Sequence, residues 1–278
     1  MSFGKPLVLA ALLLALLACL PTALGEETVP LYSRIIDVPG AGPLQYYAQN
    51  DPEWARSVYE PYRSSNCRPF GSSGCGPTAA AIAIARQVPA GRLNDLLSSA
   101  ADPAKGFPYC PCSVNNYTCD RTHEVTYPAT GEDFLTHLPV IFGSFAAGNN
   151  SGREFFRKEH TTTSLGVFSA LARAYGLHYR STREWEKARV ALEAGCSVIT
   201  TVTAGAFTSS SHYLFLASVD DGYVYVLDPL MRESYDTLDK KHLLEVVEPG
   251  LVRAQLSSLS SLNFSGFYII SDEEIVLE

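Results

Sequence analysis

The C-terminal half of the chain alternates short apolar runs with polar turns, which is typical of a β-sheet. The runs "CSVITTVT", "YLFLASV", "YVYVLD" and "SGFYII" are rich in β-branched and aromatic residues, and they predict strands over 196–203, 213–219, 223–228 and 265–270. The pair Asp221-Gly222 between the second and third runs is a strong signal for a hairpin. We therefore expect antiparallel strands in this half.

Upstream of residue 196 the chain follows a helical pattern instead. An alanine-rich stretch predicts a helix over 77–86, and apolar residues at helical spacing predict two more over 164–175 and 184–193. The stretch 32–59 is expected to be extended chain and turns, and 103–130 is expected to be an irregular insert that contains cysteines. Helices followed by a run of strands predict a single α+β domain, and we assign it to 26–278.

The first 25 residues resemble a targeting segment rather than part of the fold. One early lysine, a long leucine/alanine run and Ala23-Leu24-Gly25 fit a signal peptide that is cleaved before Glu26. Two alternatives stay open, namely a retained membrane anchor and a lipoprotein box that ends at Cys19. All three place the remainder outside the cytoplasm, either secreted or in the cell envelope. No other segment approaches the ~20 apolar residues of a membrane span.

The charge of the chain bears on its partners. The formal net charge is −8, and 46% of the residues are hydrophobic, which is enough for a sizeable core. Nucleic-acid binding requires a basic face, so this balance argues against a nucleic-acid partner.

Cys75 lies in "GSSGCGPTAAAIAIA", between two glycines and directly before the first predicted helix. A helix N-terminus carries partial positive charge and free N–H groups, which stabilise a thiolate, and the flanking glycines let a substrate carbonyl approach. This placement predicts a nucleophile. The alternative is a cysteine that forms half of a disulfide or fills a small space in the core.

A thiolate nucleophile needs a histidine base and a group that orients the histidine. Of the six histidines, His212 alone lies at the start of an apolar strand after a polar turn. Asp228 ends the strand that follows the predicted hairpin, so it can lie beside His212. The alternatives are a surface histidine and an ordinary turn aspartate. For the oxyanion hole, Gln49 in "YYAQNDPEWA" is the predicted side-chain donor beside the Cys75 N–H.

The segments "YYAQNDPEWA", "GSSGCGPTAAAIAIA", "ALEAGCSVITTV" and "SHYLFLASVDDGYVYVLDP" together resemble bacteriocin-processing-peptidase-like cysteine peptidases, family thirty-nine of that class, in their secreted stand-alone branch. The resemblance covers about 44–229. It implies a papain-like fold, a bacterial origin, and the roles given above to Cys75, His212, Asp228 and Gln49. Two positions depart from the family, which usually has two glycines at Ser210-Ser211 and Asn at Leu227. The first departure is expected to narrow the cleft.

The remaining cysteines leave several interpretations open. If Cys75 stays a thiol, five cysteines remain after an ordinary signal peptide has been removed, and one of those five must also stay unpaired. They are Cys67, Cys110, Cys112, Cys119 and Cys196. Those in the insert form a disulfide-tied loop, a zinc site completed by His123 or Cys196, or neither. A Cys-x-Cys spacing is a weaker zinc signal than paired Cys-x-x-Cys motifs.

We interpret the chain as an exported thiol hydrolase that cleaves peptide or other amide bonds and needs no metal or organic cofactor. The predicted partner is a peptide or protein substrate, including a cell-wall peptide. Two alternatives remain, namely an amidase of peptidoglycan or isopeptide bonds with the same fold, and a binding or adhesion module that keeps the fold without turnover. The set of Gln49, Cys75, His212 and Asp228 argues against the binding module, which has no need of all four.

Overall fold

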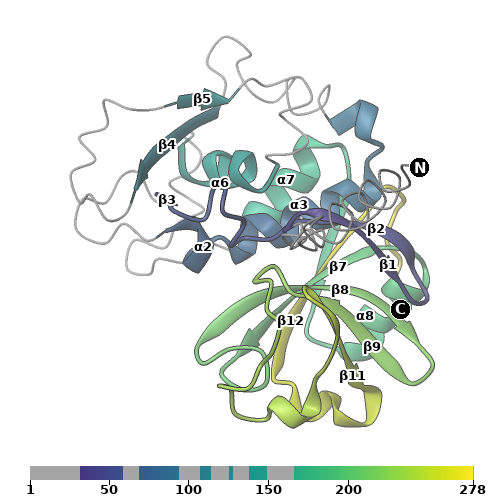
Figure 1. Ribbon diagram of the computed structural model, residues 1–278. Helices are drawn as coiled ribbons and strands as arrows, with labels where there is room; N and C mark the ends of the chain where they lie inside the picture. The colour runs from purple at the N-terminus through teal and green to yellow at the C-terminus, as the bar shows by residue number, and fades with distance from the viewer. Residues whose placement is uncertain are drawn as a thin grey trace, which may run out of the picture. The chain divides into compact units, whose positions relative to one another are not determined.

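The computed structural model describes residues 32–58, 69–93, 107–113, 125–127, 138–148 and 166–277, with backbone alone at 57–58, 107–113, 125–127 and 144–148. Within these ranges an antiparallel sheet of seven strands carries the C-terminal half of the chain (Figure 1), in the order β10-β11-β9-β8-β7-β12-β6. The strands are β6 (His178–Thr182), β7 (Ser197–Thr203), β8 (Ser211–Asp220), β9 (Tyr223–Leu227), β10 (Glu245–Glu248), β11 (Leu251–Gln255) and β12 (Phe264–Ser271). The predicted antiparallel sheet is confirmed.

The hairpin between β8 and β9 closes at the predicted turn. Asp220 pairs with Tyr223, so the loop consists of Asp221 and Gly222, with φ angles of 44° and 80°. Two consecutive positive φ values match the twist of a two-residue hairpin, and Asp-Gly tolerates them. This turn places Asp228, just after β9, alongside the start of β8.

Helices cover one side of the sheet. These are α3 (Cys75–Gln87), α6 (Leu138–Gly148) and α7 (Gly166–Ala174), and they gather on one side of it in Figure 1. The short helix α2 (Phe70–Ser73) leads into α3, and α8 (Trp185–Glu193) packs on the opposite face, where its Ala188, Ala191 and Leu192 join a second core.

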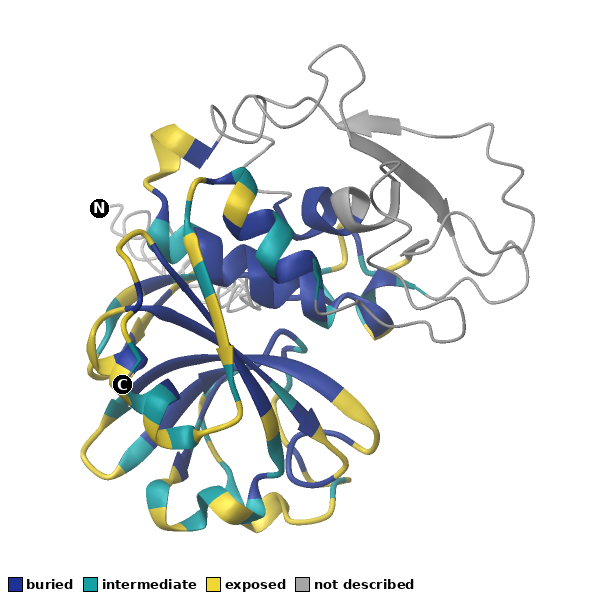
Figure 2. Cartoon of the chain, turned by 180° about the vertical axis from the view of Figure 1, so that it is seen from behind, coloured by how far each residue is buried: buried dark blue, intermediate teal, exposed yellow. Residues whose placement is uncertain are grey.

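Helix α3 is buried on nearly all sides, as the dark blue of Figure 2 shows. Its residues from Gly76 to Ile84 are buried, and Ala79, Ala80, Ala81 and Ala83 have no exposed surface. Small side chains let neighbouring elements approach closely, so one helix can pack against both the sheet and α6. The position of Cys75 is therefore fixed by a helix that is held from several directions.

Several elements were not predicted. The hairpin of β1 (Arg34–Val38) and β2 (Gly42–Tyr46) forms where extended chain and turns were expected. A second small sheet joins β3 (Ser57–Val58), β4 (Phe107–Ser113) and β5 (Val125–Tyr127), so the expected irregular insert contains strands. The described residues also include the 3₁₀ turns η2 (Lys241–Leu243) and η3 (Leu256–Ser261).

Some predictions fall outside the described residues. These are the leader at 1–25 with its alternatives and most of the insert at 103–130. In the described ranges, no helix combines the length and the apolar character needed to cross a membrane.

Candidate active site

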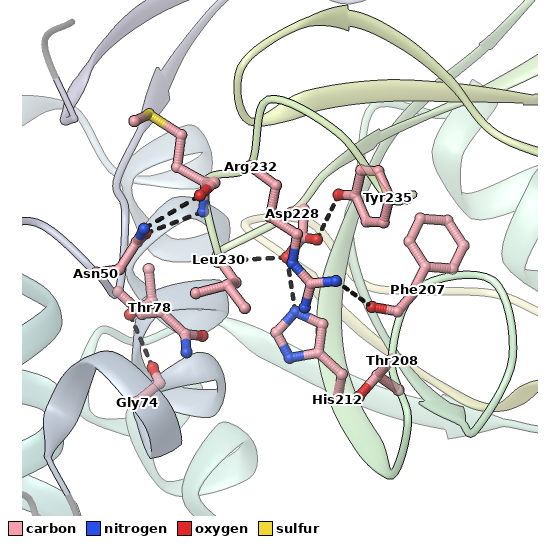
Figure 3. Close-up of polar contacts among 12 residues, drawn as sticks. Asn50, Gly74, Thr78, Phe207, Thr208, His212, Asp228, Leu230, Arg232 and Tyr235 are labelled. Carbon is pink, nitrogen blue, oxygen red and sulfur yellow. Dashed lines mark hydrogen bonds and ion pairs between the residues drawn. The ribbon is translucent and has the colours of Figure 1, made fainter. Parts of the chain in front are cut away.

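Cys75 is the first residue of α3, two positions earlier than the predicted helix start. The helix begins there because Gly74 lets the chain turn tightly from α2: a Cβ at Gly74 would lie 2.5 Å from the Phe70 ring. The Gly74 carbonyl accepts hydrogen bonds from the Thr78 N–H at 3.0 Å and from the Thr78 hydroxyl at 2.7 Å (Figure 3). The half-buried Cys75 thiol is free, at the positive end of a 13-residue helix.

His212 is the second residue of β8, where it pairs with Val202 of β7, and only 6% of it is exposed. Its Nε2 lies 2.6 Å from Asp228 Oδ1 (Figure 3). With Nε2 donating to the carboxylate, Nδ1 is the ring nitrogen left for another partner. Cys75 and His212 line one cavity, and the thiol is among the groups that raise the pKa of His212.

Asp228 has no exposed surface, yet its carboxylate is fully partnered. Oδ1 accepts the His212 bond and a bond from the Leu230 N–H at 2.8 Å, and Oδ2 accepts a bond from the Tyr235 hydroxyl at 2.5 Å. The main chain of Asp228 is held as well, because its carbonyl accepts a bond from the Tyr46 hydroxyl at 2.7 Å. A buried carboxylate is costly unless it is hydrogen-bonded and paired, and here both conditions are met.

The surroundings favour an ion pair between the two side chains. Burial alone would lower the pKa of His212, but the charge and hydrogen bond of Asp228, with those of Cys75, raise it to about 10. Burial would raise the pKa of Asp228, whereas the charge of His212, its hydrogen bond and Arg232 lower it. Each partner thus keeps the other charged.

Tyr235 and Arg232 complete this environment, and no sequence pattern predicted a role for either. Arg232 lies 5.1 Å from the centroid of the Tyr235 ring, and its Nη1 donates to the Phe207 carbonyl at 3.0 Å (Figure 3). Burial, then the Asp228 charge and hydrogen bond, raise the pKa of Tyr235 well above its usual value, so the hydroxyl stays a donor. Both residues follow Asp228 in a loop, where no strand or helix periodicity marks them.

Gln49 lies beside the turn that precedes the nucleophile. It is 2% exposed, and its Nε2 donates to the Gly71 carbonyl at 2.8 Å. The main-chain N–H of Gln49 donates to the Pro229 carbonyl at 2.7 Å, and the side chain of Asn50 bonds both main-chain groups of Met231. The segment thus connects the α2–α3 turn to the chain just after Asp228. Gln49 is not among the described residues that line the cavity.

The cavity has a volume of about 1010 Å³ and extends from the start of α3 across β8, β7, β12 and β6. Ser210 and Ser211, which stand where the family usually has glycines, both line it. Leu277, close to the C-terminus, also contributes to its wall.

Most cysteines of the predicted disulfide or zinc set cannot be placed. Cys67 and Cys119 lie outside the described residues, as do the side chains of Cys110 and Cys112. Cys196 is a free, buried thiol, which agrees with the expectation that a second cysteine stays unpaired. Among the described residues, no group of three His, Cys, Asp or Glu side chains is placed to hold a metal ion.

Comparison with family models identifies a relationship for most of the described site. Residues 43–248 match the model of the family described as Peptidase_C39 like family, a span that includes Gln49, Cys75, His212 and Asp228. Among curated proteins, none matches the chain.

Proposed function

The chain belongs to the Peptidase_C39 like family, which suggests a cysteine peptidase, and we propose that it cleaves amide bonds of peptides outside the cytoplasm with Cys75 as nucleophile. One observation carries this proposal. Buried His212, joined to Asp228 at 2.6 Å through Nε2, lines the same cavity as a free thiol at a helix N-terminus. Nucleophile, base and orienting group in this order are the parts that thiol hydrolysis requires.

In the first half of the proposed reaction, the Cys75 thiolate attacks the carbonyl carbon of the substrate. The negative charge that develops on the carbonyl oxygen is stabilised by the Cys75 N–H and by a Gln49 amide proton that is not engaged by Gly71. The C–N bond then breaks, and protonated His212 gives its proton to the departing amine. The product of this half is a thioester on Cys75.

In the second half, His212 removes a proton from water as the water attacks the thioester carbon. The C–S bond breaks, the acid product leaves, and the thiolate and imidazolium are restored. Asp228 stabilises the imidazolium and fixes which ring nitrogen faces the cleft, because its carboxylate holds Nε2.

Export of the protein is part of the proposal. We infer that residues 1–25 are removed and that the mature chain begins at Glu26. N-terminal sequencing of the protein recovered outside the cells tests this cleavage, and an intact N-terminus or a lipid-modified Cys19 would contradict it.

The central test is labelling of the folded mature chain with iodoacetamide, followed by peptide mapping and by hydrolysis of a peptide library. Cys75 is expected to label faster than Cys196, which is buried, and prior alkylation of Cys75 is expected to stop hydrolysis. Rapid labelling of another cysteine with Cys75 inert would refute the mechanism. Labelling of Cys75 without any hydrolysis would favour a binding module.

A further inference from the structure

The walls of the cavity are unusually rich in hydroxyl groups. Of the nineteen described residues that line it, eleven carry a hydroxyl, whereas Val202 and Leu277 are the only large aliphatic ones. Hydroxyls both donate and accept hydrogen bonds, so such a surface suits small polar groups and peptide backbone better than bulky apolar side chains.

The sheet brings these hydroxyls together. Thr203 pairs with Ser211, and Tyr268 pairs with both Ser181 and Ile199, so β8, β7, β12 and β6 present their residues at one end of the sheet. Thr201 Oγ1 and Ser265 Oγ lie 2.8 Å apart and share a hydrogen bond across β7 and β12. The hydroxyl-rich cavity wall is therefore built on four paired strands, which hold it more rigidly than loops would.

One positive charge at the β6 end of the cavity is uncompensated. Among the cavity-lining residues there, Lys187 pairs with Glu184 at 3.4 Å, which leaves Arg183. Arg183 is exposed and has no carboxylate partner in the described part of the chain. It stands in the short turn between β6 and α8, where the Glu184 N–H bonds the Thr182 hydroxyl at 3.0 Å.

This charge stands out against the rest of the molecule. The chain carries a net charge of −8, so an anionic substrate is repelled by the protein as a whole. A guanidinium with a free donor fork inside the cleft is a site that can overcome this repulsion locally, because it binds carboxylates through two parallel hydrogen bonds.

We propose that the cleft selects peptides with small, polar residues near the scissile bond and a carboxylate that binds Arg183. The carboxylate is either an acidic side chain or the free C-terminus of the peptide. The inference rests on the proposed function only in taking this cavity as the substrate cleft.

Equilibrium binding to the Cys75→Ala variant tests the proposal without requiring turnover. The probes are acetylated, amidated hexapeptides of Gly, Ala, Ser and Thr, with Glu or Gln at one scanned position. A second set lacks Glu and carries either a free or an amidated C-terminus. At one scanned position, we expect the Glu probe to bind about fivefold more tightly than the Gln probe, or else the probe with a free C-terminal acid to bind about fivefold more tightly than its amide. This ratio of affinities should be smaller at high salt.

Two further variants identify the residue responsible. Arg183→Gln is expected to abolish the preference. Arg180→Gln is the matched control, because Arg180 is exposed on β6, the strand just before Arg183, but does not line the cavity, and it is expected to leave the preference intact.

The outcomes separate this inference from the proposed function. The inference would be overturned by equal binding of acid and amide probes, by a preference that survives Arg183→Gln, or by no binding at all. It would also be overturned if probes that carry Leu or Phe in place of a small residue bound more tightly. Hydrolysis by the unmodified chain and Cys75 labelling are measured separately, and their failure would overturn the proposed function instead.

Discussion

Asp228 has no exposed surface and its carboxylate accepts three hydrogen bonds, whereas Cys75, on the other side of the pair, is half-buried and faces a cavity of about 1010 Å³. The carboxylate that holds the proposed base, His212, is therefore bonded by protein groups alone, while the proposed nucleophile, Cys75, is open to whatever enters the cleft. This contrast indicates that the sheet residues hold His212 and Asp228 in a fixed geometry, whereas the start of α3 leaves Cys75 accessible. Substitutions on the two sides are accordingly expected to fail in different ways.

The largest expected effect comes from the reacting groups themselves. Cys75→Ala and His212→Ala should each lower kcat by on the order of 10⁶, and Asp228→Ala by on the order of 10⁴, if the triad behaves like the measured serine-protease case. Cys75→Ala should keep its stability, because alanine suits a helix start facing a cavity. The unfolding free energy of Asp228→Ala should fall by about 3–5 kcal/mol, since the substitution leaves His212 buried without its counter-charge.

Kinetics and denaturant unfolding of the three variants check this prediction. Similar residual rates for all three would mean that Asp228 does more than orient the base, and parent-like turnover in any of them would remove that residue from the mechanism.

The next largest effect concerns the oxyanion. Gln49→Ala is expected to lower kcat by about 10²–10³ with little change in KM, because the donor meets its target only as charge develops on the carbonyl oxygen. Gln45→Ala is the matched control, since the Gln45 amide bonds main-chain carbonyls of the β1–β2 hairpin. Steady-state kinetics measures both. A Gln49→Ala enzyme that alkylates normally at Cys75 and turns over at the parent rate would show that the hole is built from the Ser209–Ser211 turn or from backbone amides alone.

A smaller effect is expected at the second layer around the carboxylate. Tyr235→Phe removes the hydrogen bond to Oδ2, and Tyr46→Phe removes the bond to the Asp228 carbonyl. Each should cost about 1–3 kcal/mol of unfolding free energy. Only Tyr235→Phe should also lower kcat/KM, by about tenfold, because it alone frees the carboxylate to turn.

Thermal unfolding and kinetics on both tyrosine variants separate positioning from simple stability. Equal losses of activity in the two would indicate that Tyr235 acts only by holding the fold together.

The last expected effect is on stability alone and takes the form of a dependence on pH. The pKa of His212 is raised from 6.5 to about 10 in the folded chain, so its stabilisation is complete below about pH 6.5 and is lost as the pH rises through about 10. Unfolding free energy should therefore fall over this window. His212→Ala should remove that fall, and Cys75→Ala should move it to lower pH, because the thiol contributes to the raised pKa. Denaturant melts at several pH values measure this, and identical profiles for the unmodified chain and His212→Ala would contradict it.

The features predictable from the sequence are those encoded within a few residues of each other. The hairpin at Asp221-Gly222 follows from turn chemistry, and from that hairpin the closeness of His212 and Asp228 follows as well. The α3 helix was recognisable from its alanines, but its start at Cys75 was not, because the tight turn depends on Gly74 meeting the Phe70 ring.

Features assembled from distant segments escaped prediction. Tyr235, only seven residues from Asp228, escaped for a different reason, because it lies in an irregular loop. The hydroxyl-rich cavity wall combines residues from four strands, and β12 pairs there with strands that are far from it in sequence. No periodicity marks such residues before the sheet order is known. The strand order β7-β12-β6, in which the last strand inserts between two earlier ones, is a long-range pairing of the same kind.

The dipeptide Gln49-Asn50 has a consequence for how the site can change over evolution. Its main chain donates a hydrogen bond to Pro229, and its Asn50 side chain bonds both main-chain groups of Met231. Its Gln49 side chain donates to the carbonyl of Gly71, shortly before Cys75. Two residues thus connect the nucleophile's turn to the segment that follows the orienting carboxylate. A mutation that shifts this dipeptide would displace both at once, so the two halves of the machinery are not free to drift independently. The proposed substrate preference at Arg183, by contrast, could be retuned without disturbing that linkage, because Arg183 forms none of these hydrogen bonds.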